Sequence, residues 1–416
     1  MKVAIVGGGA AGMMAAYSVA KNNSGAEVHL FEKNKNLGAK VIISGGGRCN
    51  LTTGILDVVQ VLKNYPRGSR FLKPAIFSFP PADVREFFEE LGVPTKCEDD
   101  NRVFPVSNNG YDVVAAFERF FDKSNVNVHL NTQIAEVCVN KKNEQESEFE
   151  LKIKSSTTSE FFDKLILTTG GQAYRHTGSS GDGYAFAEAC GHSVTDLGPS
   201  LNSFILNDSR LSELSGVSLK RVALKARDAK NKKHECSGPV LITHKGLTGP
   251  VVFAMSAQLS FTEFSSDSPR TLFVDLLPDF SINELFNRFD NYFALNPKKF
   301  FKHFLFDFLP KSLVDYLASN IDINIDAPCD SLSKKTVHKF LEYTKNVELK
   351  LIGRGKGDEF VTAGGVLRSE IDSKSMQSKI VPGLYFAGEI IDVDGITGGF
   401  NLQASWATGM LAGILN

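Results

Sequence analysis

The chain has 416 residues, of which 42% are hydrophobic and 22% charged, and its 46 basic and 47 acidic side chains leave a formal net charge of -1. Its composition is that of a globular protein, and at roughly 150 residues per domain the length predicts two or three domains. The balanced charge supplies no global field to attract nucleic acid or an anionic membrane. No apolar run approaches the ~20 residues that cross a bilayer. We therefore expect neither a nucleic-acid partner nor a membrane partner.

The cysteines and the N-terminus indicate the compartment. Six cysteines lie far apart in the chain and form no C-x-x-C pair, which disfavours a dithiol motif and a thiolate zinc site. The opening MKVAIVGGGAAG has too short an apolar core for a signal peptide, and glycines interrupt it. We expect reduced thiols, no metal and a cytoplasmic location.

The first thirty residues predict a dinucleotide-binding unit. A strand over 3–6 leads into the turn Gly7-x-Gly9-x-x-Gly12, an Ala/Met-rich helix, and a second strand that ends at Glu32, 20 residues after Gly12. Gly7 suits the tight turn, Gly9 lets a pyrophosphate approach the backbone, Gly12 allows close packing of helix and strand, and Glu32 can bind an adenosine ribose. A purely structural glycine turn is the alternative, but it gives Glu32 no reason to stand at this interval.

The stretch ISGGGRCN follows. Successive amides of Gly45, Gly46 and Gly47 can form a concave anion-binding nest, and the missing side chains permit close approach to a cofactor. Arg48 could reinforce a pyrophosphate or bind an anionic substrate. A Cys49 thiolate beside Arg48 would be reactive, but no resolving cysteine is near in sequence, and a small buried residue explains Cys49 equally well.

A later segment of the chain returns to the predicted nucleotide site, and this favours FAD over NAD as the cofactor. Residues 149–171 suggest a β-meander, and its last strand, KLILTT, delivers the chain to Gly170 and Gly171. The stretch TGSSGDGYAFAEACG then predicts a short helix with Asp182 as N-cap and Gly183 at its start. That helix is either purely structural or part of a loop packed beside the flavin.

The C-terminal segment predicts support for the isoalloxazine ring. A strand over 384–387 ends at Gly388 and Glu389, and a glycine loop then leads to a helix that opens near Asn401. The amides of Asn401, Leu402 and Gln403 would face the flavin N1 and C2 carbonyl, where negative charge builds on reduction.

The middle of the chain reads as an insertion. Short β-type runs fill about 201–273, and a Phe- and Leu-rich helical pattern fills 282–343. The basic run from Lys220 to His234 alternates with apolar residues, as on a solvated strand face. The segment 353–357 lacks the spacing of a second dinucleotide turn, so NADH or NADPH would visit the flavin only transiently. We expect substrate in a cleft between the flavin and the inserted domains.

Several side chains are candidates for chemistry. Possible acid–base groups are His244 in THKGLTGP and Tyr174 and His176 in GGQAYRHTG, although a lone loop histidine is more often structural. Arg48 and Arg102 could anchor a substrate carboxylate. No catalytic base emerges from these patterns, and Cys49 is a further weak candidate.

Five motifs occur in order over the whole chain: KVIISGGGRCNLTT, TGGQAYRHTGSSGDGYAFA, THKGLTGP, VTAGGV and GLYFAGEIIDVDGITGGFNLQASWATG. Through them the sequence resembles the BaiN-like, or aminoacetone-oxidase-like, family of flavoprotein oxidoreductases. The resemblance implies a split FAD domain interrupted by a small β-barrel-like domain and a small helical domain. The sequence departs from the family at Phe400, where tyrosine is common, and at Ile396, where proline is common.

The resemblance also implies contacts to FAD. They fall at Gly7, Gly9, Ala11, Gly12, Glu32, Lys33, Lys40, Gly46, Arg48, Cys49, Gly170, Gly171, Gly388, Glu389, Asn401 and Gln403. Neighbours in the same motifs complete the predicted cofactor-binding set, namely Ala10, Ser44, Gly45, Gly47, Thr169, Asp182, Gly399 and Leu402.

These observations predict an α/β fold with a Rossmann-type FAD-binding domain and a β-meander. The expected division is 1–198 and 359–416 for the FAD domain, 199–273 for the β-rich insertion with a return strand near 345–358, and 274–344 for the helical domain. The expected function is an FAD-dependent oxidoreductase that transfers hydride through flavin N5 to or from a small organic substrate. A flavin-dependent RNA-modifying enzyme and a non-catalytic flavin-binding sensor or assembly protein are the alternatives.

Overall fold

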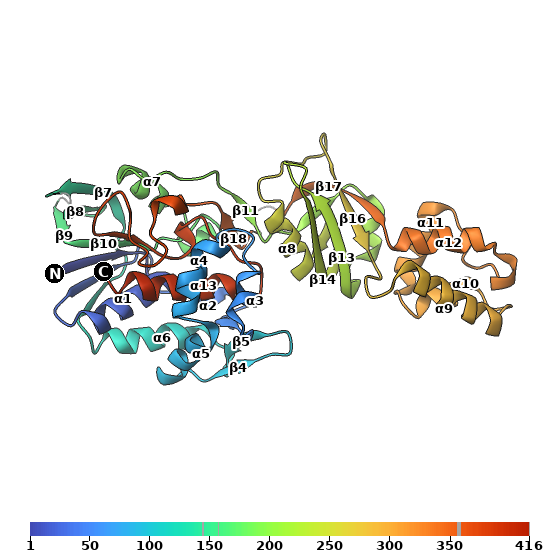
Figure 1. The fold of residues 1–416 in the computed structure, drawn as a ribbon, viewed down its shortest axis with the longest axis horizontal. Helices are drawn as coiled ribbons and strands as arrows, with labels where there is room; N and C mark the ends of the chain where they lie inside the picture. The colour runs from blue at the N-terminus through green and yellow to red at the C-terminus, as the bar shows by residue number, and fades with distance from the viewer. Residues whose placement is uncertain (144, 157, 356–358, 416) are drawn as a thin grey trace. The chain divides into compact units, whose positions relative to one another are not determined.

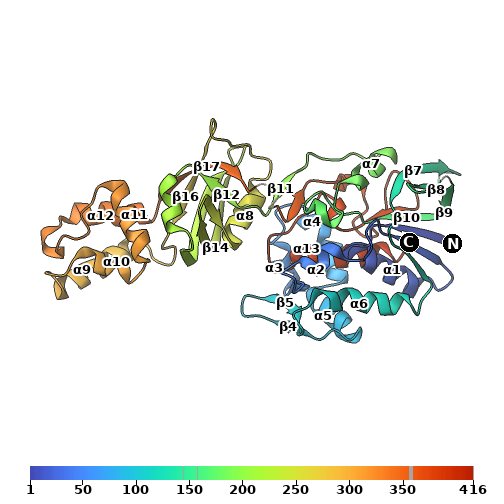
Figure 2. The same cartoon turned by 180° about the vertical axis from the view of Figure 1, so that it is seen from behind.

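The computed structural model describes residues 1–143, 145–156, 158–355 and 359–415. They form two compact units: one joins Met1–Ser200 to the segment from Glu359 onward, and the other begins at Leu201 (Figures 1 and 2). The predicted domain boundary at 358/359 and the ends of the segments 345–358 and 353–357 fall on residues outside the described ones. The finer division into four segments stays a prediction.

The first unit is built on a five-stranded parallel sheet with the order β19-β10-β1-β2-β6. Its strands are β1 (Lys2–Val6), β2 (Glu27–Phe31), β6 (Val126–His129), β10 (Lys164–Leu167) and β19 (Leu384–Phe386). The central strand β1 is buried along 3–6, as a parallel strand covered on both faces must be. The carboxyl ends of β1, β2, β10 and β19 carry the motifs that the sequence singles out.

The predicted meander is present, but its last strand belongs elsewhere. Strands β7 (Ile134–Lys141), β8 (Ser147–Ile153) and β9 (Ser159–Phe162) form an antiparallel sheet. The KLIL strand, β10, joins the parallel sheet instead, because Leu165, Ile166 and Leu167 are all fully buried beside β1. This pairing carries the chain directly to the nucleotide edge of the sheet.

Helices α1 (Ala10–Asn22) and α13 (Phe400–Ala412) pack together beside this sheet (Figure 1). A Cβ on Gly409 would lie 2.5 Å from the Ala11 carbonyl oxygen, so only glycine permits the approach. The Ser18 hydroxyl donates to the Met410 carbonyl at 2.7 Å. Small residues therefore couple the first and last helices of the chain.

Shorter elements complete the first unit. Its remaining helices are α2 (Ala39–Ile43), α3 (Val58–Leu62), α4 (Ser69–Ser78), α5 (Pro81–Glu90), α6 (Gly110–Phe121) and α7 (Asp182–Ala189). A small sheet contains β3 (Thr52–Thr53), β5 (Arg102–Pro105) and β4 (Thr95–Cys97), and β11 (Gly198–Ser200) pairs antiparallel with β18 (Val361–Ala363). The β11–β18 pair joins the two chain segments of this unit.

The second unit contains a closed barrel in the order β12-β15-β14-β13-β16-β17. Its strands are β12 (Phe204–Leu206), β13 (Ser218–Arg227), β14 (Lys233–Thr243), β15 (Gly246–Thr248), β16 (Arg270–Asp275) and β17 (Val347–Arg354). Its helices are α8 (Pro250–Gln258), α9 (Ile282–Leu295), α10 (Phe301–Phe306), α11 (Lys311–Ile321) and α12 (Lys334–Thr344). One apolar cluster includes residues of both barrel and helices, such as Leu224, Val252 and Phe340. The predicted α/β fold with a meander and an inserted barrel is thus confirmed.

Candidate functional site

The N-terminal glycine turn has the geometry that its spacing predicts. Gly7 has φ 109°, and a Cβ there would lie 2.6 Å from the Thr168 carbonyl oxygen. A Cβ on Gly12 would lie 1.8 Å from the Gly7 carbonyl oxygen, whereas a Cβ on Gly9 would meet nothing within 4 Å. Two glycines therefore bring helix and strand together, and Gly9 leaves backbone open at the start of α1, where a phosphate group can approach.

Glu32 lies at the end of β2 beside this turn. Its buried carboxylate accepts hydrogen bonds from the amides of Gly8 at 2.7 Å and Asn34 at 2.8 Å. Burial raises the pKa of the Glu32 carboxyl, while the two amide hydrogen bonds and the charge of Lys33 act to lower it. The carboxylate is thus held rigidly at the position where a Rossmann unit binds a ribose hydroxyl.

Asp182 does not have the N-cap role that the sequence predicts for it. Helix α7 begins at Asp182, and its N-cap is Gly181 with φ 85°, so Asp182 is not the cap. Its carboxylate instead forms an ion pair with Lys33 at 2.8 Å and accepts from the Ser180 hydroxyl at 2.9 Å. The salt bridge joins the end of β2 to the helix that follows β10, and the prediction missed it because the partners are 149 residues apart.

The GGGRCN stretch forms a left-handed turn after α2. Gly45, Gly46 and Gly47 have φ values of 59°, 73° and 87°, and Cβ atoms on Gly46 and Gly47 would meet nothing within 4 Å. A Cβ on Gly45 would press on Phe104 at 2.9 Å. The turn thus exposes backbone at its middle, as an anion-binding nest requires, although the Gly47 amide already donates to the Ile43 carbonyl at 3.1 Å.

Arg48 and Cys49 are both engaged within the protein. The Arg48 guanidinium lies 3.8 Å from the Phe104 ring centroid and forms an ion pair with Glu98 at 2.7 Å. Cys49 is fully buried, and burial raises the pKa of its thiol to about 12. At neutral pH Cys49 is therefore a thiol rather than a nucleophilic thiolate, which favours the interpretation as a small buried residue.

A chain of contacts joins the N-terminal and C-terminal segments. Lys40 in α2 forms an ion pair with Glu389 at 2.7 Å, and the Glu389 carboxylate accepts from the Thr362 amide at 2.8 Å. The Thr362 hydroxyl oxygen accepts from the amides of Gln172 at 2.8 Å and Ala173 at 3.1 Å. Sequence reasoning missed Thr362, although the VTAGGV motif contains it.

The glycines after β10 and β19 permit this network. A Cβ on Gly171 would lie 2.4 Å from the Thr362 hydroxyl oxygen, and a Cβ on Gly388 would lie 2.7 Å from the Ala11 Cβ. The Thr169 hydroxyl, just before Gly170 and Gly171 in the chain, is buried with no hydrogen-bond partner among the described residues. Buried polar groups normally have a hydrogen-bond partner, so this hydroxyl is consistent with a ligand that supplies one.

Helix α13 begins one residue before the predicted start. Its N-cap is Gly399 with φ 89°, and no side chain caps it. The Gln403 amide donates to the Gly399 carbonyl at 2.9 Å, so the prediction that this amide faces the flavin is wrong. The first-turn amides of Phe400, Asn401 and Leu402 precede that first intrahelical bond, and they form the positive end of the helix.

The side chains of this first turn are structural. The Asn401 amide group donates to the Gly395 carbonyl and accepts from the Gly395 amide, both at 2.8 Å. Gln403 is fully buried, donates to the Phe79 carbonyl at 2.7 Å and accepts from the Thr52 hydroxyl at 2.5 Å. They hold the helix start and the preceding glycine loop in one position.

The remaining candidates belong to different elements of the two units. Tyr174 and His176 belong to a short 3-10 turn, with Tyr174 half-buried and His176 exposed. His244 is exposed in the turn between β14 and β15 of the second unit. Arg102 pairs with Glu98 at 3.2 Å and Asp100 at 2.7 Å, so acidic neighbours already balance it.

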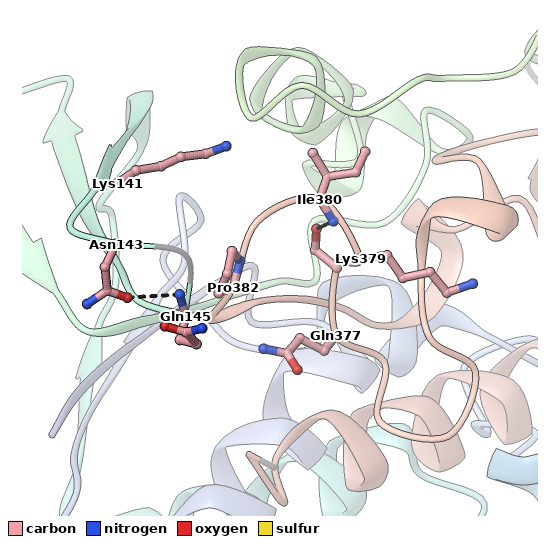
Figure 3. A pocket seen from close by; sticks show the side chains of 8 residues that line it. Lys141, Asn143, Gln145, Gln377, Lys379, Ile380 and Pro382 are labelled. Carbon is pink, nitrogen blue, oxygen red and sulfur yellow. Dashed lines mark hydrogen bonds between the residues drawn. The ribbon is translucent and has the colours of Figure 1, made fainter.

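A surface pocket of about 790 Å³ is lined by none of the predicted cofactor residues (Figure 3). Its lining mixes polar and apolar surface, with two cationic side chains and three amides among Lys141, Asn143, Gln145, Gln377, Ser378, Lys379, Ile380 and Pro382. Within the described part of the chain, no group of three or more His, Cys, Asp or Glu side chains could hold a metal ion. No described helix is both long enough and apolar enough to cross a membrane.

The fold and this site define a class. The Rossmann sheet, the open glycine turn, the acidic end of β2 and the uncapped start of α13 are those of an FAD-dependent oxidoreductase. The chain belongs to the HI0933-like family, since the family model for the HI0933-like protein Rossmann domain matches residues 1–415. The resemblance to BaiN-like flavoproteins is confirmed, and the cofactor is FAD.

Relatives match over nearly the full length. The chain is 28% identical to a 3-dehydro-bile acid delta(4,6)-reductase of Clostridium scindens, over 99% of this chain and 98% of the relative. It is 30% identical to a ribosomal RNA dihydrouridine synthase of Haemophilus influenzae, over 97% of this chain and 95% of the relative. A ribosomal RNA dihydrouridine synthase of Escherichia coli is 29% identical, over 97% of this chain and 95% of the relative.

Two solved structures share the fold at low identity. The FrdA chain of Escherichia coli quinol fumarate reductase aligns with a TM-score of 0.50 at 13% identity, covering 99% of this chain and 69% of its own. The 3-ketosteroid delta1-dehydrogenase of Sterolibacterium denitrificans aligns with a TM-score of 0.50 at 12% identity, and the alignment covers 99% of this chain and 98% of that one.

The residues present fit FAD. Open backbone at Gly9, Gly46 and Gly47 leaves room for phosphates, and Glu32 offers a carboxylate to a ribose. The uncapped start of α13 offers donors to the pyrimidine end of the ring. The individual contacts of this predicted set remain a prediction.

Proposed function

We propose that this protein uses reduced FAD to saturate a carbon–carbon double bond conjugated to a carbonyl in a small organic substrate. The names of its relatives support the reaction class. A 3-dehydro-bile acid with delta(4,6) unsaturation and the uracil ring of uridine both carry such a double bond. Bound reduced FAD would supply a hydride from N5 to one carbon of the double bond, and a proton from water would go to the other carbon. We propose that NADH or NADPH visits the flavin transiently to reduce it, and that the protein works in the cytoplasm.

One observation carries the role of the protein in this reaction. Helix α13 has Gly399 as its N-cap and no side-chain capping hydrogen bond, and Asn401, Gln403 and Thr52 hold this helix start in place. Its positive end would bind the pyrimidine part of the flavin and favour the reduced, anionic form. Lys40, paired with Glu389, would support the same cofactor from the N-terminal segment.

The test is anaerobic. The holoenzyme is reduced with NADH or NADPH while flavin absorbance is followed, and the reduced enzyme is then mixed with 2-cyclohexenone. We expect bleaching by one nicotinamide and recovery of the yellow colour with formation of cyclohexanone. The proposal would be contradicted if dioxygen reoxidised the reduced enzyme but no conjugated carbonyl compound did so.

A second candidate substrate is a uridine in ribosomal RNA. It is favoured by the hairpin of β13 and β14, where six cationic side chains are exposed: Lys220, Arg221, Arg227, Lys230, Lys232 and Lys233. Asp279 balances Arg221 at 2.6 Å, but the turn end retains Lys230, Lys232 and Lys233. A cationic hairpin could bind phosphates even in a chain of balanced charge.

The salt dependence of RNA binding distinguishes this candidate substrate from a small organic one. Binding of a ribosomal RNA fragment is measured by fluorescence anisotropy at 50 and 200 mM salt, because phosphate contacts weaken steeply over that range. We expect replacement of Lys230, Lys232 and Lys233 by alanine to weaken such binding, with Lys298 and Lys334 as exposed controls on the helical part. The absence of salt-sensitive binding by the unaltered protein would exclude RNA as the substrate.

A further inference from the structure

A buried carboxylate stands directly before the glycine loop that leads into α13. The Asp394 side chain is fully buried, and Gly395 follows it in the chain. The Asn401 side chain accepts from the Gly395 amide and donates to the Gly395 carbonyl, both at 2.8 Å. Asp394 is therefore attached to the backbone that fixes the start of α13, the predicted support of the flavin.

The two carboxylate oxygens of Asp394 have different surroundings. Oδ2 forms an ion pair with the Arg67 guanidinium and accepts from the Ser200 hydroxyl at 2.7 Å. Oδ1 is also buried, but it has no hydrogen-bond partner among the described residues. Nearly all buried polar atoms have a partner, and an ionised oxygen without one is unfavourable. A proton added at Oδ1 would remove this charge without breaking either contact of Oδ2.

The groups that face Asp394 come from three segments. Arg67 precedes α4, Ser200 ends β11, and Asp392 lies two residues before Asp394. Burial raises the pKa of the Asp394 carboxyl, and the charge of Asp392 acts in the same direction. The Arg67 charge and the hydrogen bonds from Arg67 and Ser200 oppose this rise. Arg368 pairs with Asp392 at 3.0 Å, so two guanidinium groups balance the two carboxylates.

Reduction of the bound FAD to its anionic form would add a negative charge to this balanced set. Charges in a buried environment interact over long distances because the effective dielectric constant is low. A new negative charge raises the pKa of a nearby carboxyl group, since it disfavours the ionised form. A proton can compensate the new charge most readily at Oδ1 of Asp394, where no hydrogen bond has to be given up.

We propose that Asp394 takes up a proton at Oδ1 when the bound FAD is reduced and releases it when the FAD is reoxidised. This inference rests on the proposed reduction of a conjugated double bond and adds the proton balance of that reaction. First, NADH or NADPH gives a hydride to the flavin, and water gives a proton to Asp394. Then the hydride passes to one carbon of the double bond, the Asp394 proton returns to water, and water protonates the other carbon. Each double bond thus consumes one reduced nicotinamide and one proton.

The test is the pH dependence of the flavin midpoint potential in the holoenzyme. The potential is measured between pH 7 and pH 8.5 by anaerobic titration with dithionite, with no organic substrate present. Asp394→Asn keeps the shape of the side chain but cannot take up the proton, and Ser200→Ala keeps the carboxylate. Asp83→Asn, at an exposed position on α5, is the control for loss of an acidic group.

Each proton that accompanies two electrons shifts the midpoint potential by about 30 mV per pH unit. We expect about 59 mV per pH unit, or two protons, for the wild type, Ser200→Ala and Asp83→Asn. Asp394→Asn should show about 30 mV per pH unit, because only the flavin then takes up a proton. The same slope in the wild type and Asp394→Asn would overturn the proposal.

A second measurement uses the unaltered holoenzyme and decides the outcome if Asp394→Asn does not fold. The reduced-minus-oxidised infrared difference spectrum should show a new carbonyl band of a protonated carboxylic acid, which shifts when the aspartate carboxyl groups carry carbon-13. Absence of this band would also overturn the proposal. A two-proton slope in a protein that does not reduce 2-cyclohexenone would leave the role of Asp394 standing and refute the proposed reaction.

Discussion

The Lys40 ammonium lies 2.7 Å from the Glu389 carboxylate, although 349 residues separate them in the chain. Lys40 lies in α2 of the N-terminal segment, and Glu389 follows β19 in the C-terminal segment. This ion pair therefore connects the two segments that the resemblance assigns to FAD. The Glu389 side chain is only 14% exposed, and it also accepts from the Thr362 amide.

Replacing Lys40 by methionine should weaken FAD binding. The change keeps an unbranched side chain of nearly the same length but leaves Glu389 with an uncompensated and largely buried charge, which costs roughly 1–3 kcal/mol. We expect the FAD dissociation constant, measured by equilibrium dialysis, to rise about tenfold, or ~1.4 kcal/mol. The control is Lys35→Met, on an exposed lysine of the neighbouring loop. Unchanged FAD affinity in Lys40→Met would remove this pair from the cofactor site.

Gly12→Ala should prevent the close packing of α1 on β1. The added Cβ would lie 1.8 Å from the Gly7 carbonyl oxygen, and neither backbone can retreat without moving the turn. Such overpacking costs about 1–3 kcal/mol or more, so we expect a lower midpoint of thermal unfolding and a protein purified without yellow colour. Gly25→Ala is the matched control, because a Cβ there meets nothing within 4 Å.

Cys49 should resist alkylation in the folded protein. Its side chain is fully buried, and burial raises the pKa of its thiol to about 12, so almost no thiolate forms at pH 8. We expect iodoacetamide to modify the exposed Cys97 and to spare Cys49 until the protein is unfolded, as read by peptide mass spectrometry. Rapid modification of Cys49 in the native protein would revive the redox interpretation.

Stability should fall in mild acid because of a stacked histidine pair. His29 Nδ1 lies 2.9 Å from His129 Nε2, and their rings are parallel within 4°. Burial and then the charge of His29 lower the pKa of His129, against the opposing effect of Glu160. Since the folded pKa lies below the ordinary value near 6.5, this contribution is complete above pH 6.5 and declines as the pH falls below it.

The thermal midpoint, followed between pH 8 and pH 5, checks this expectation. His129→Phe keeps a ring in the stack and removes the titrating group, so its midpoint should depend less on pH than that of the wild type. His176→Phe, at an exposed site, should leave the pH dependence unchanged. Equal pH dependence in all three proteins would assign the acid sensitivity to other groups.

The sequence by itself determined the parts that local backbone geometry controls. The close approach of Gly12 to the Gly7 carbonyl and the acid at the end of β2 follow from short spacings, because their partners Gly7 and Gly8 lie within the same strand–helix–strand segment. The same reason explains the glycine loop before α13, where positive φ at Gly399 admits few other residues.

The tertiary structure alone decided which side chains are available for chemistry. Glu98 and Phe104 engage Arg48, burial keeps the Cys49 thiol protonated, and Thr52 binds the Gln403 side chain from 351 residues away. These outcomes depend on pairings between distant segments, and no local pattern encodes them. Charge, burial and hydrogen bonding at the site are set only when β3, β5 and α13 are packed together, since solvation and partner choice are properties of the folded chain.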